Sequence, residues 1–210
     1  MAASRAGRVG AIEALLHAGV GLEWHDRWHR TALHWAVVNG REDATAALVG
    51  AGAAVNGVPM PVPRHRARPF RRLTPSWHRR VSPHQVSKHI RHTTLPQETP
   101  LHSAARLASP VSAVALVSLL IGARADPDRT DQFGQRPLHV AAGRAPGGGG
   151  SEPCHGAEEQ LLRLLCPLAA TARAPDGAGI TPIERARRTG SARAERVLAE
   201  LVDRMVDRMG

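Results

Sequence analysis

The sequence contains very few aromatic residues and cysteines. Among 210 residues there are two phenylalanines, four tryptophans and no tyrosine. Helices built of small residues pack in register without large aromatic side chains, so this composition does not exclude a folded core. The only cysteines are Cys154 and Cys166, which are too few for a disulfide framework or a cysteine-based zinc site. The composition therefore excludes the small secreted proteins that depend on disulfide bonds.

Long apolar segments are also missing from the sequence. No apolar run approaches the ~20 residues that a helix needs to cross a bilayer. Arg5 and Arg8 lie near the N-terminus, but no continuous apolar stretch follows them as it would in a signal peptide. Together with the scarcity of cysteine, these features predict an intracellular protein, cytoplasmic or nuclear, that has no membrane partner.

What the sequence does contain is repetition. One four-residue phrase occurs four times, as Thr31-Ala32-Leu33-His34, Thr99-Pro100-Leu101-His102, Arg136-Pro137-Leu138-His139 and Thr181-Pro182-Ile183-Glu184. A second set of identical or similar residues is separated by 33 positions, as in Gly7 and Gly40, Ala11 and Ala44, Leu15 and Leu48, Leu16 and Val49, Gly19 and Gly52, Leu22 and Val55. Self-similarity with this period is typical of solenoid proteins, in which no unit can bury its apolar face alone.

Each repeat carries the signals of two short helices and a turn. Thr31 can act as the N-cap of the first helix, and the prolines of the later copies fit the first helical turn, where no N–H is required. Asn39 and Gly40 end this helix with residues that tolerate a positive φ. A second helical pattern follows and ends at Gly52.

These motifs resemble the ankyrin repeat, in which a Thr-Pro-Leu-His opening and later glycines mark two antiparallel helices and a hairpin-like finger. The resemblance implies an all-α ankyrin-repeat solenoid of about five stacked helix-turn-helix units, with an incomplete first unit and two flexible insertions. It also implies a non-enzymatic scaffold or adaptor that binds a protein partner through its concave face and fingers.

Several positions depart from the repeat pattern. The sequence enters the first unit in mid-helix at Met1, so either this unit is frayed or the natural protein is longer at this end. Gln97 stands where a turn glycine is expected, and Glu184 replaces histidine in the last unit. Arg136 replaces a capping threonine, which should weaken that helix start by about 1 kcal/mol.

Two insertions interrupt the repeats. We expect N-terminal repeats over residues 1–58, a basic Pro/Arg/His-rich loop over 59–93, and C-terminal repeats over 94–210. The first insertion is poor in apolar residues and has little periodicity, which predicts a disordered loop; a degenerate repeat or an error in the gene model are the alternatives. The second insertion, 145–157, contains four consecutive glycines. It lacks the strand and helix of a phosphate-binding loop, so we expect a flexible linker.

The C-terminal segment, residues 191–209, predicts one further helix. Apolar residues recur along it from Val197 to Met209 at steps of one and three, which is typical of an amphipathic helix. We expect this helix to cap the stack. Its additional length also suits contact with a partner or with a second copy of the chain.

The positive charge is concentrated in the first insertion. Residues 57–97 contain nine arginines and lysines and no acidic residue, which leaves only +1 of the net charge of +10 for the rest of the chain. Arginine-rich segments neutralise phosphates, and a tryptophan can stack on an exposed base. The alternative function is therefore binding to nucleic acid or another acidic surface, or nuclear import, through Arg64, Arg66, Arg68, Arg71, Arg72, Trp77, Arg79 and Arg80.

The histidines do not predict a metal or catalytic site. His34, His102 and His139 recur at one position of the repeat, which predicts a structural role in each helix opening. His25 and His29 are four residues apart but lie in a turn, which does not favour zinc. No nucleophile–base motif stands out, so we expect no catalytic residue, cofactor, metal or small-molecule substrate.

The fingers and the exposed side of the first helices carry the candidates for contact with a protein partner. Tryptophan and arginine are enriched among the residues that dominate binding energy at interfaces. The predicted partner-binding residues are Trp24, His25, Arg27, Trp28, Arg30, Val38, Asn39, Gln132, Phe133 and Gln135.

Overall fold

The computed structural model describes residues 1–26, 29–57, 98–144, 155–166 and 169–206. Every regular element within these ranges is an α-helix, which confirms the predicted fold class. In chain order the helices are α1 (Ala2–Ala6), α2 (Val9–His17), α3 (Ala32–Val38), α4 (Glu42–Gly50), α6 (Pro100–Ala105), α7 (Pro110–Gly122), α8 (Pro137–Ala142), α9 (His155–Leu165), α10 (Ala169–Arg173), α11 (Pro182–Arg188) and α12 (Ala192–Val206).

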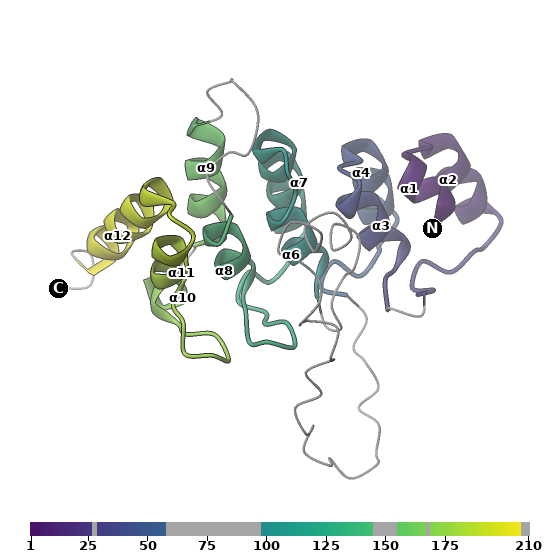
Figure 1. The fold of residues 1–210 in the computed structure, drawn as a ribbon. Coiled ribbons are helices and arrows are strands. Elements are labelled where there is room, and N and C mark those ends of the chain that lie inside the picture. The colour runs from purple at the N-terminus through teal and green to yellow at the C-terminus, as the bar shows by residue number, and fades with distance from the viewer. Residues whose placement is uncertain (27–28, 58–97, 145–154, 167–168, 207–210) are drawn as a thin grey trace, which may run out of the picture.

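The helices form a row of pairs, with the two ends of the chain at opposite ends of the row (Figure 1). The pairs are α1 with α2, α3 with α4, α6 with α7, α8 with α9, and α11 with α12. The first members of successive pairs contact one another from α1 to α11, and we call them the inner helices. The second members do the same from α2 to α12 and form the outer row. This serial packing is the architecture of a solenoid.

The inner helices begin as the repeated phrase predicts. Thr31 and Thr99 are N-caps, and the backbone N–H of each donates to Nδ1 of the histidine three residues later, at 3.2 Å. Because Nδ1 accepts this hydrogen bond, the ring proton lies on Nε2. Nε2 of His34 then donates to the carbonyl oxygen of Glu98 at 3.0 Å, and Nε2 of His102 donates to that of Gln135 at 2.9 Å. Each histidine therefore ties its own helix start to the next repeat.

The stack is continuous across residues 58–97. Helix α3 contacts α6, and α4 contacts α7. The side chain of Asn56 accepts a hydrogen bond from the backbone N–H of Asp126 at 2.8 Å, and the bond from His34 to Glu98 spans the same boundary. The repeat that ends near Gly57 and the repeat that starts at Thr99 are thus direct neighbours in the stack.

The fourth repeat differs in two places from what the sequence predicted. Helix α9 begins at His155, so the last residues of the predicted linker 145–157 are helical. Helix α10, which no periodic pattern indicated, occupies five residues after α9 and packs against α11 and α12. It is held to the finger that precedes α8, because Thr171 donates a hydrogen bond to the carboxylate of Asp128 at 2.9 Å.

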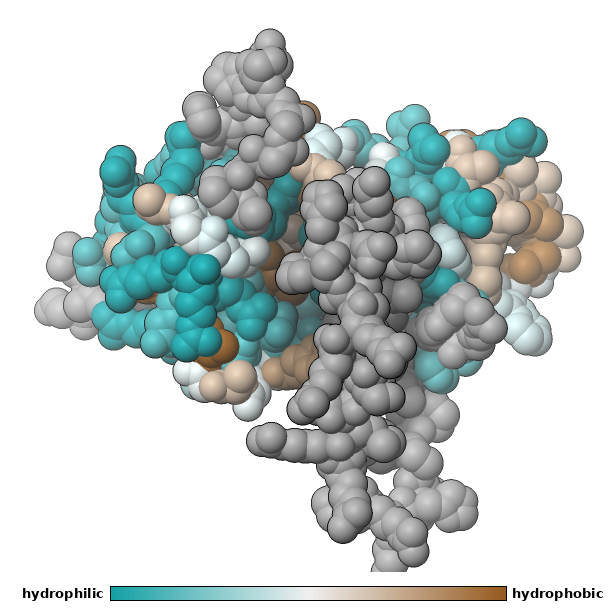
Figure 2. All heavy atoms as spheres, viewed as in Figure 1, coloured by the Kyte–Doolittle hydropathy of each residue, from teal (hydrophilic) through white to brown (hydrophobic). Residues whose placement is uncertain are grey.

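One apolar interior runs through the described part of the stack, from Ile12 to Val202. Alanines and leucines fill it, which confirms that small side chains suffice for helices at this close spacing. Its two ends differ. Figure 2 shows apolar residues in tan and brown at the N-terminal end and mostly hydrophilic residues over the C-terminal repeats.

Candidate partner-binding surface

Three fingers, which are the segments that precede α3, α8 and α11, are closed by the same hydrogen bonds of an aspartate. Asp26, Asp131 and Asp176 each stand five residues before the N-cap of an inner helix. In each finger the backbone N–H of the aspartate donates to the carbonyl oxygen four residues later, at 2.9–3.0 Å. The aspartate Oδ1 accepts the backbone N–H of that same later residue. These paired bonds fix the turn locally, as an aspartate in a turn typically does.

The finger of the fourth repeat presents an exposed aromatic side chain on this rigid turn. Phe133 is 49 % exposed, and its backbone N–H donates to Oδ1 of Asp131 at 2.8 Å. Its carbonyl oxygen accepts from the backbone N–H of Gly177 in the next finger at 2.9 Å. A Cβ on Gly177 would lie 2.6 Å from that oxygen, so only glycine permits this approach. Gln132 is exposed beside Phe133.

The finger between the first two repeats presents a second aromatic side chain. Trp24 is 72 % exposed, and its neighbour His25 is also exposed. The ring of His25 stacks on that of His29, with centroids 4.9 Å apart. The described residues contain no group of three or more His, Cys, Asp or Glu side chains that could hold a metal ion.

Three predicted contact residues use their polar groups inside the protein. Arg30 is only 3 % exposed: its guanidinium bonds to Asp26 at 2.8 Å and lies over the Trp35 ring, 3.9 Å from the centroid. Asn39 donates its side-chain amide to the carbonyl oxygen of Trp35 at 2.8 Å. The side-chain oxygen of Gln135 accepts from Arg185 at 3.1 Å. These groups stabilise the stack itself.

The remaining predicted residues divide into two groups. Val38 is half-buried at the end of α3. Arg27, Trp28 and the basic residues from Arg64 to Arg80 lie outside the described residues. The structure thus brings Trp24 and His25 together on one finger and Gln132 and Phe133 together on another.

Burial determines the ionisation of Cys166 and of the three histidines that recur at one position of the inner helices. Desolvation lowers the pKa of His34 from 6.5 to about 4, and it lowers the pKa values of His102 and His139 in the same direction. These imidazoles are therefore neutral at pH 7, as their hydrogen bonds require. Burial raises the pKa of the Cys166 thiol to about 11, so that side chain is a neutral thiol and a poor nucleophile at pH 7.

Two features of this surface were not predicted. The aspartates of the fingers could have been recognised from the sequence, because they recur five residues before three of the four helix openings. The contacts of the Trp35 ring with the guanidinium groups of Arg30 and Arg5, which lie 3.9 and 5.9 Å from the ring centroid, could not. Arg5 comes from α1, and nothing in the repeat pattern specifies its direction.

Comparison with known protein families agrees with this geometry. The model of the family described as Ankyrin repeat matches residues 28–58 and 97–132. The chain contains ankyrin repeats. Its repeats extend beyond the matched residues, because α8 with α9 and α11 with α12 continue the same rows. No curated protein gives a significant match to the chain.

Ankyrin repeats are generally protein–protein interaction modules and are generally found in non-enzymatic scaffolds. Within the described ranges, no helix has the length and apolar character that spanning a membrane requires.

Proposed function

We propose that this ankyrin-repeat protein is a non-enzymatic scaffold or adaptor that binds a protein partner through its fingers and concave face. The observation that supports this most strongly is the exposure of Phe133 on a finger whose backbone is fixed on both sides. An aromatic side chain offers a large contact area, and a rigid backbone loses little conformational entropy on binding.

The contact set that we propose is smaller than the one predicted from the sequence. Trp24, His25, Gln132 and Phe133 are exposed and belong to fingers. Arg30 and Gln135 are excluded from the proposed set, because their polar groups already bind Asp26 and Arg185. The partner should therefore meet aromatic and neutral polar groups at the fingertips.

Phe133→Ala tests the proposal against a matched control. Val111 is 59 % exposed at the start of α7, in the outer row and away from the fingers. Partners captured from cells by the wild-type protein should bind the Phe133→Ala variant roughly tenfold or more weakly, and bind Val111→Ala unchanged. Equal binding to both variants, with equal helix content by circular dichroism, would contradict the finger surface.

A second function is favoured by one specific observation, the nine basic and no acidic residues in 57–97. Such a segment can neutralise phosphates of a nucleic acid. Affinity for an oligonucleotide should then fall steeply between roughly 50 and 200 mM salt and be lost when residues 58–97 are deleted. An affinity that does not change with salt would argue against it.

A further inference from the structure

Arginines recur at the C-terminal ends of the inner helices. Arg106 and Arg188 each stand seven residues after the threonine that caps their helix. Val38 holds this position in the second repeat, and Arg5 precedes it by the 33-residue offset. In the fourth repeat the arginine is displaced by one residue, to Arg144. The inner helices contact one another in order, so these four arginines follow each other along the stack, and we call them the arginine row.

The arginine row faces few opposite charges. Among the described residues, no carboxylate forms an ion pair with Arg5, Arg144 or Arg188. The guanidinium of Arg106 lies 3.5 Å from the carboxylate of Glu98, which exceeds the ~2.7–2.9 Å of a strong charge-assisted hydrogen bond. The Nε atom of Arg106 is buried and has no hydrogen-bond partner.

The two rows of helices also differ in their acidic residues. The inner helices α1, α3, α6, α8 and α11 contain a single acidic residue, Glu184. In the outer row, α2, α4, α9 and α12 all carry aspartate or glutamate. The inner row therefore presents an excess of positive charge, whereas the outer row does not.

The arginine row can be reached from solvent. Arg5 and Arg188 are exposed, and the side chain of Arg106 is 34 % exposed. The guanidinium of Arg144 donates to the carbonyl oxygens of Ala105 at 3.4 Å and Ala108 at 3.0 Å, which flank Arg106 in the chain. Arg144 thus places a second positive charge beside the C-terminal end of α6.

The helix dipole alone does not account for this recurrence. The partial negative charge at a helix C-terminus favours a nearby cation. The same effect acts on the outer helices, yet α4 and α7 have no basic residue in their last turns. The preference for arginine therefore follows the inner row and not helix ends in general.

We propose that the arginine row binds an extended acidic segment of a partner protein. Packed helices lie roughly 8–10 Å apart, so the row from α1 to α11 spans about 30–40 Å. An extended chain rises ~3.3 Å per residue, so about twelve residues reach along it, with about three residues for each repeat. This inference rests on the proposed scaffold function and specifies the charge of the partner, because complementary charge selects partners and fixes their register.

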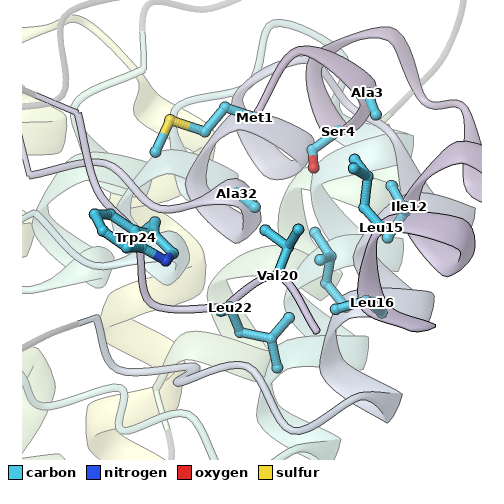
Figure 3. A pocket seen from close by; sticks show the side chains of 12 residues that line it. Met1, Ala3, Ser4, Ile12, Leu15, Leu16, Val20, Leu22, Trp24 and Ala32 are labelled. Atoms are coloured by element: carbon cyan, nitrogen blue, oxygen red, sulfur yellow. The ribbon is translucent and has the colours of Figure 1, made fainter. Parts of the chain in front are cut away.

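The surroundings of the row favour a peptide over a nucleic acid. Single-stranded nucleic acids are bound by aromatic side chains on which bases stack. Ala6, Leu107 and Thr189 adjoin the row and carry no aromatic ring, and the Trp35 ring is already in contact with Arg30. The pocket of about 160 Å³ at the N-terminal end of the stack is lined mainly by apolar side chains and includes no member of the arginine row (Figure 3).

A synthetic peptide of about twelve residues, with glutamate at every third position and serine and glycine between, provides the probe. The control peptide has glutamine in place of each glutamate. Fluorescence anisotropy measures the affinity of both for the full chain. The glutamate peptide should bind roughly tenfold or more tightly, and the difference should shrink between roughly 50 and 200 mM salt.

Matched protein variants locate the binding, because residues 57–97 also carry positive charge. A triple variant with Arg5→Gln, Arg106→Gln and Arg188→Gln should bind the glutamate peptide about tenfold more weakly. Lysine at the same three positions keeps the charge and should retain most of the affinity. The control triple variant removes three exposed arginines of α12 and should bind as the wild type does; it carries Arg193→Gln, Arg196→Gln and Arg204→Gln.

Val38→Arg tests the proposal by a gain of affinity and does not depend on the folding of the triple variants. It supplies the arginine that the second repeat lacks, and should raise affinity for the glutamate peptide about threefold. Ser118→Arg adds the same charge at an exposed position of α7 in the outer row and should leave affinity unchanged. Circular dichroism checks the helix content of every variant.

Equal affinity for the two peptides would overturn the proposal, and so would equal losses in the two glutamine triple variants or equal affinities of Val38→Arg and Ser118→Arg. A single-stranded oligonucleotide that binds more tightly than the glutamate peptide, and loses more affinity in the Arg5, Arg106 and Arg188 glutamine variant, would overturn the choice of a peptide. Because the probe is synthetic, these results do not depend on whether Phe133 contributes to binding a partner.

Discussion

The two ends of the stack differ in how their outermost repeats are completed. At the N-terminal end, α1 and α2 contribute a single fully buried apolar side chain, Ile12. At the C-terminal end, α12 alone contributes Ala194, Val197, Leu198 and Val202. In this structure each of these two repeats packs on one neighbour, so its own helices contribute much of its stability. Helix α12 buries more apolar side chains than α1 and α2 do.

Helix length and capping explain this difference. Helix α12 has fifteen residues, and the hydroxyl of Ser191 accepts the backbone N–H of Ala194 at 3.3 Å. Helix α1 has five residues and no side-chain cap. Short uncapped helices gain little stability of their own, so the first repeat should open locally more often than the last.

The largest expected effect is on the free energy of unfolding, when one leucine from each end of the stack is replaced by alanine. Leu198→Ala removes a side chain with no exposed surface and should lower the free energy of unfolding by about 3 kcal/mol. Leu15→Ala removes a side chain that is 45 % exposed and should lower it by less than about 1 kcal/mol. Urea denaturation measures both. Equal losses would mean that the first repeat is as well packed as the last.

Acidification should destabilise the repeat that contains His34 more than it destabilises the last repeat. The pKa of His34 is about 4 in the folded chain and 6.5 in the unfolded chain, so between these values the unfolded state binds more protons. Stability is then complete above pH ~6.5 and falls by on the order of 3 kcal/mol as the pH drops toward 4. His102 and His139 act in the same direction. The last repeat has Glu184 at this position and lacks the imidazole.

Hydrogen exchange between pH 7 and 4.5 can follow this difference. Amides of α3 should lose protection before those of α12, after correction for the intrinsic pH dependence of exchange. His34→Gln serves as the control, because an amide does not titrate in this range and the variant should lose less stability on acidification than the wild type does. An unchanged pH dependence in this variant would contradict the assignment to His34.

The sequence predicted the helix openings well because their causes are local. Thr99, Pro100 and His102 lie within four residues, and the structure places them as a cap, a first turn and a hydrogen-bonded side chain. Helix α10 was not predicted, because five residues are too few to show a period and its contact with Asp128 comes from another repeat.

The candidate surface was predicted only in part, and the difference concerns side-chain direction. Phe133 and Trp24 were predicted to be exposed on fingers and are exposed. Arg30 was chosen for the same reason, yet its guanidinium lies between Asp26 and the ring of Trp35. A turn sequence indicates where the backbone reverses but does not specify which long side chains fold back onto a neighbouring helix.

The smallest expected effect on the free energy of unfolding comes from substitutions at equivalent positions of the first and last fingers. His29 has a φ of 60° at the position where the last finger has Gly179, with a φ of 77°. A side chain at such a φ strains the backbone, so His29→Gly should raise the free energy of unfolding by about 0.5–1 kcal/mol. The gain is partly offset because the variant loses the stacking of His29 on His25.

Gly179→Ala is the matched test of the backbone effect. A Cβ at this position meets nothing within 4 Å, so the expected loss of about 1 kcal/mol arises from the positive φ alone. Thermal unfolding of the two variants should therefore shift in opposite directions. A fall in stability for His29→Gly, together with the expected fall for Gly179→Ala, would show that stacking on His25 outweighs backbone strain in the first finger. The His25–His29 pair would then be the element that holds the exposed Trp24 finger in place.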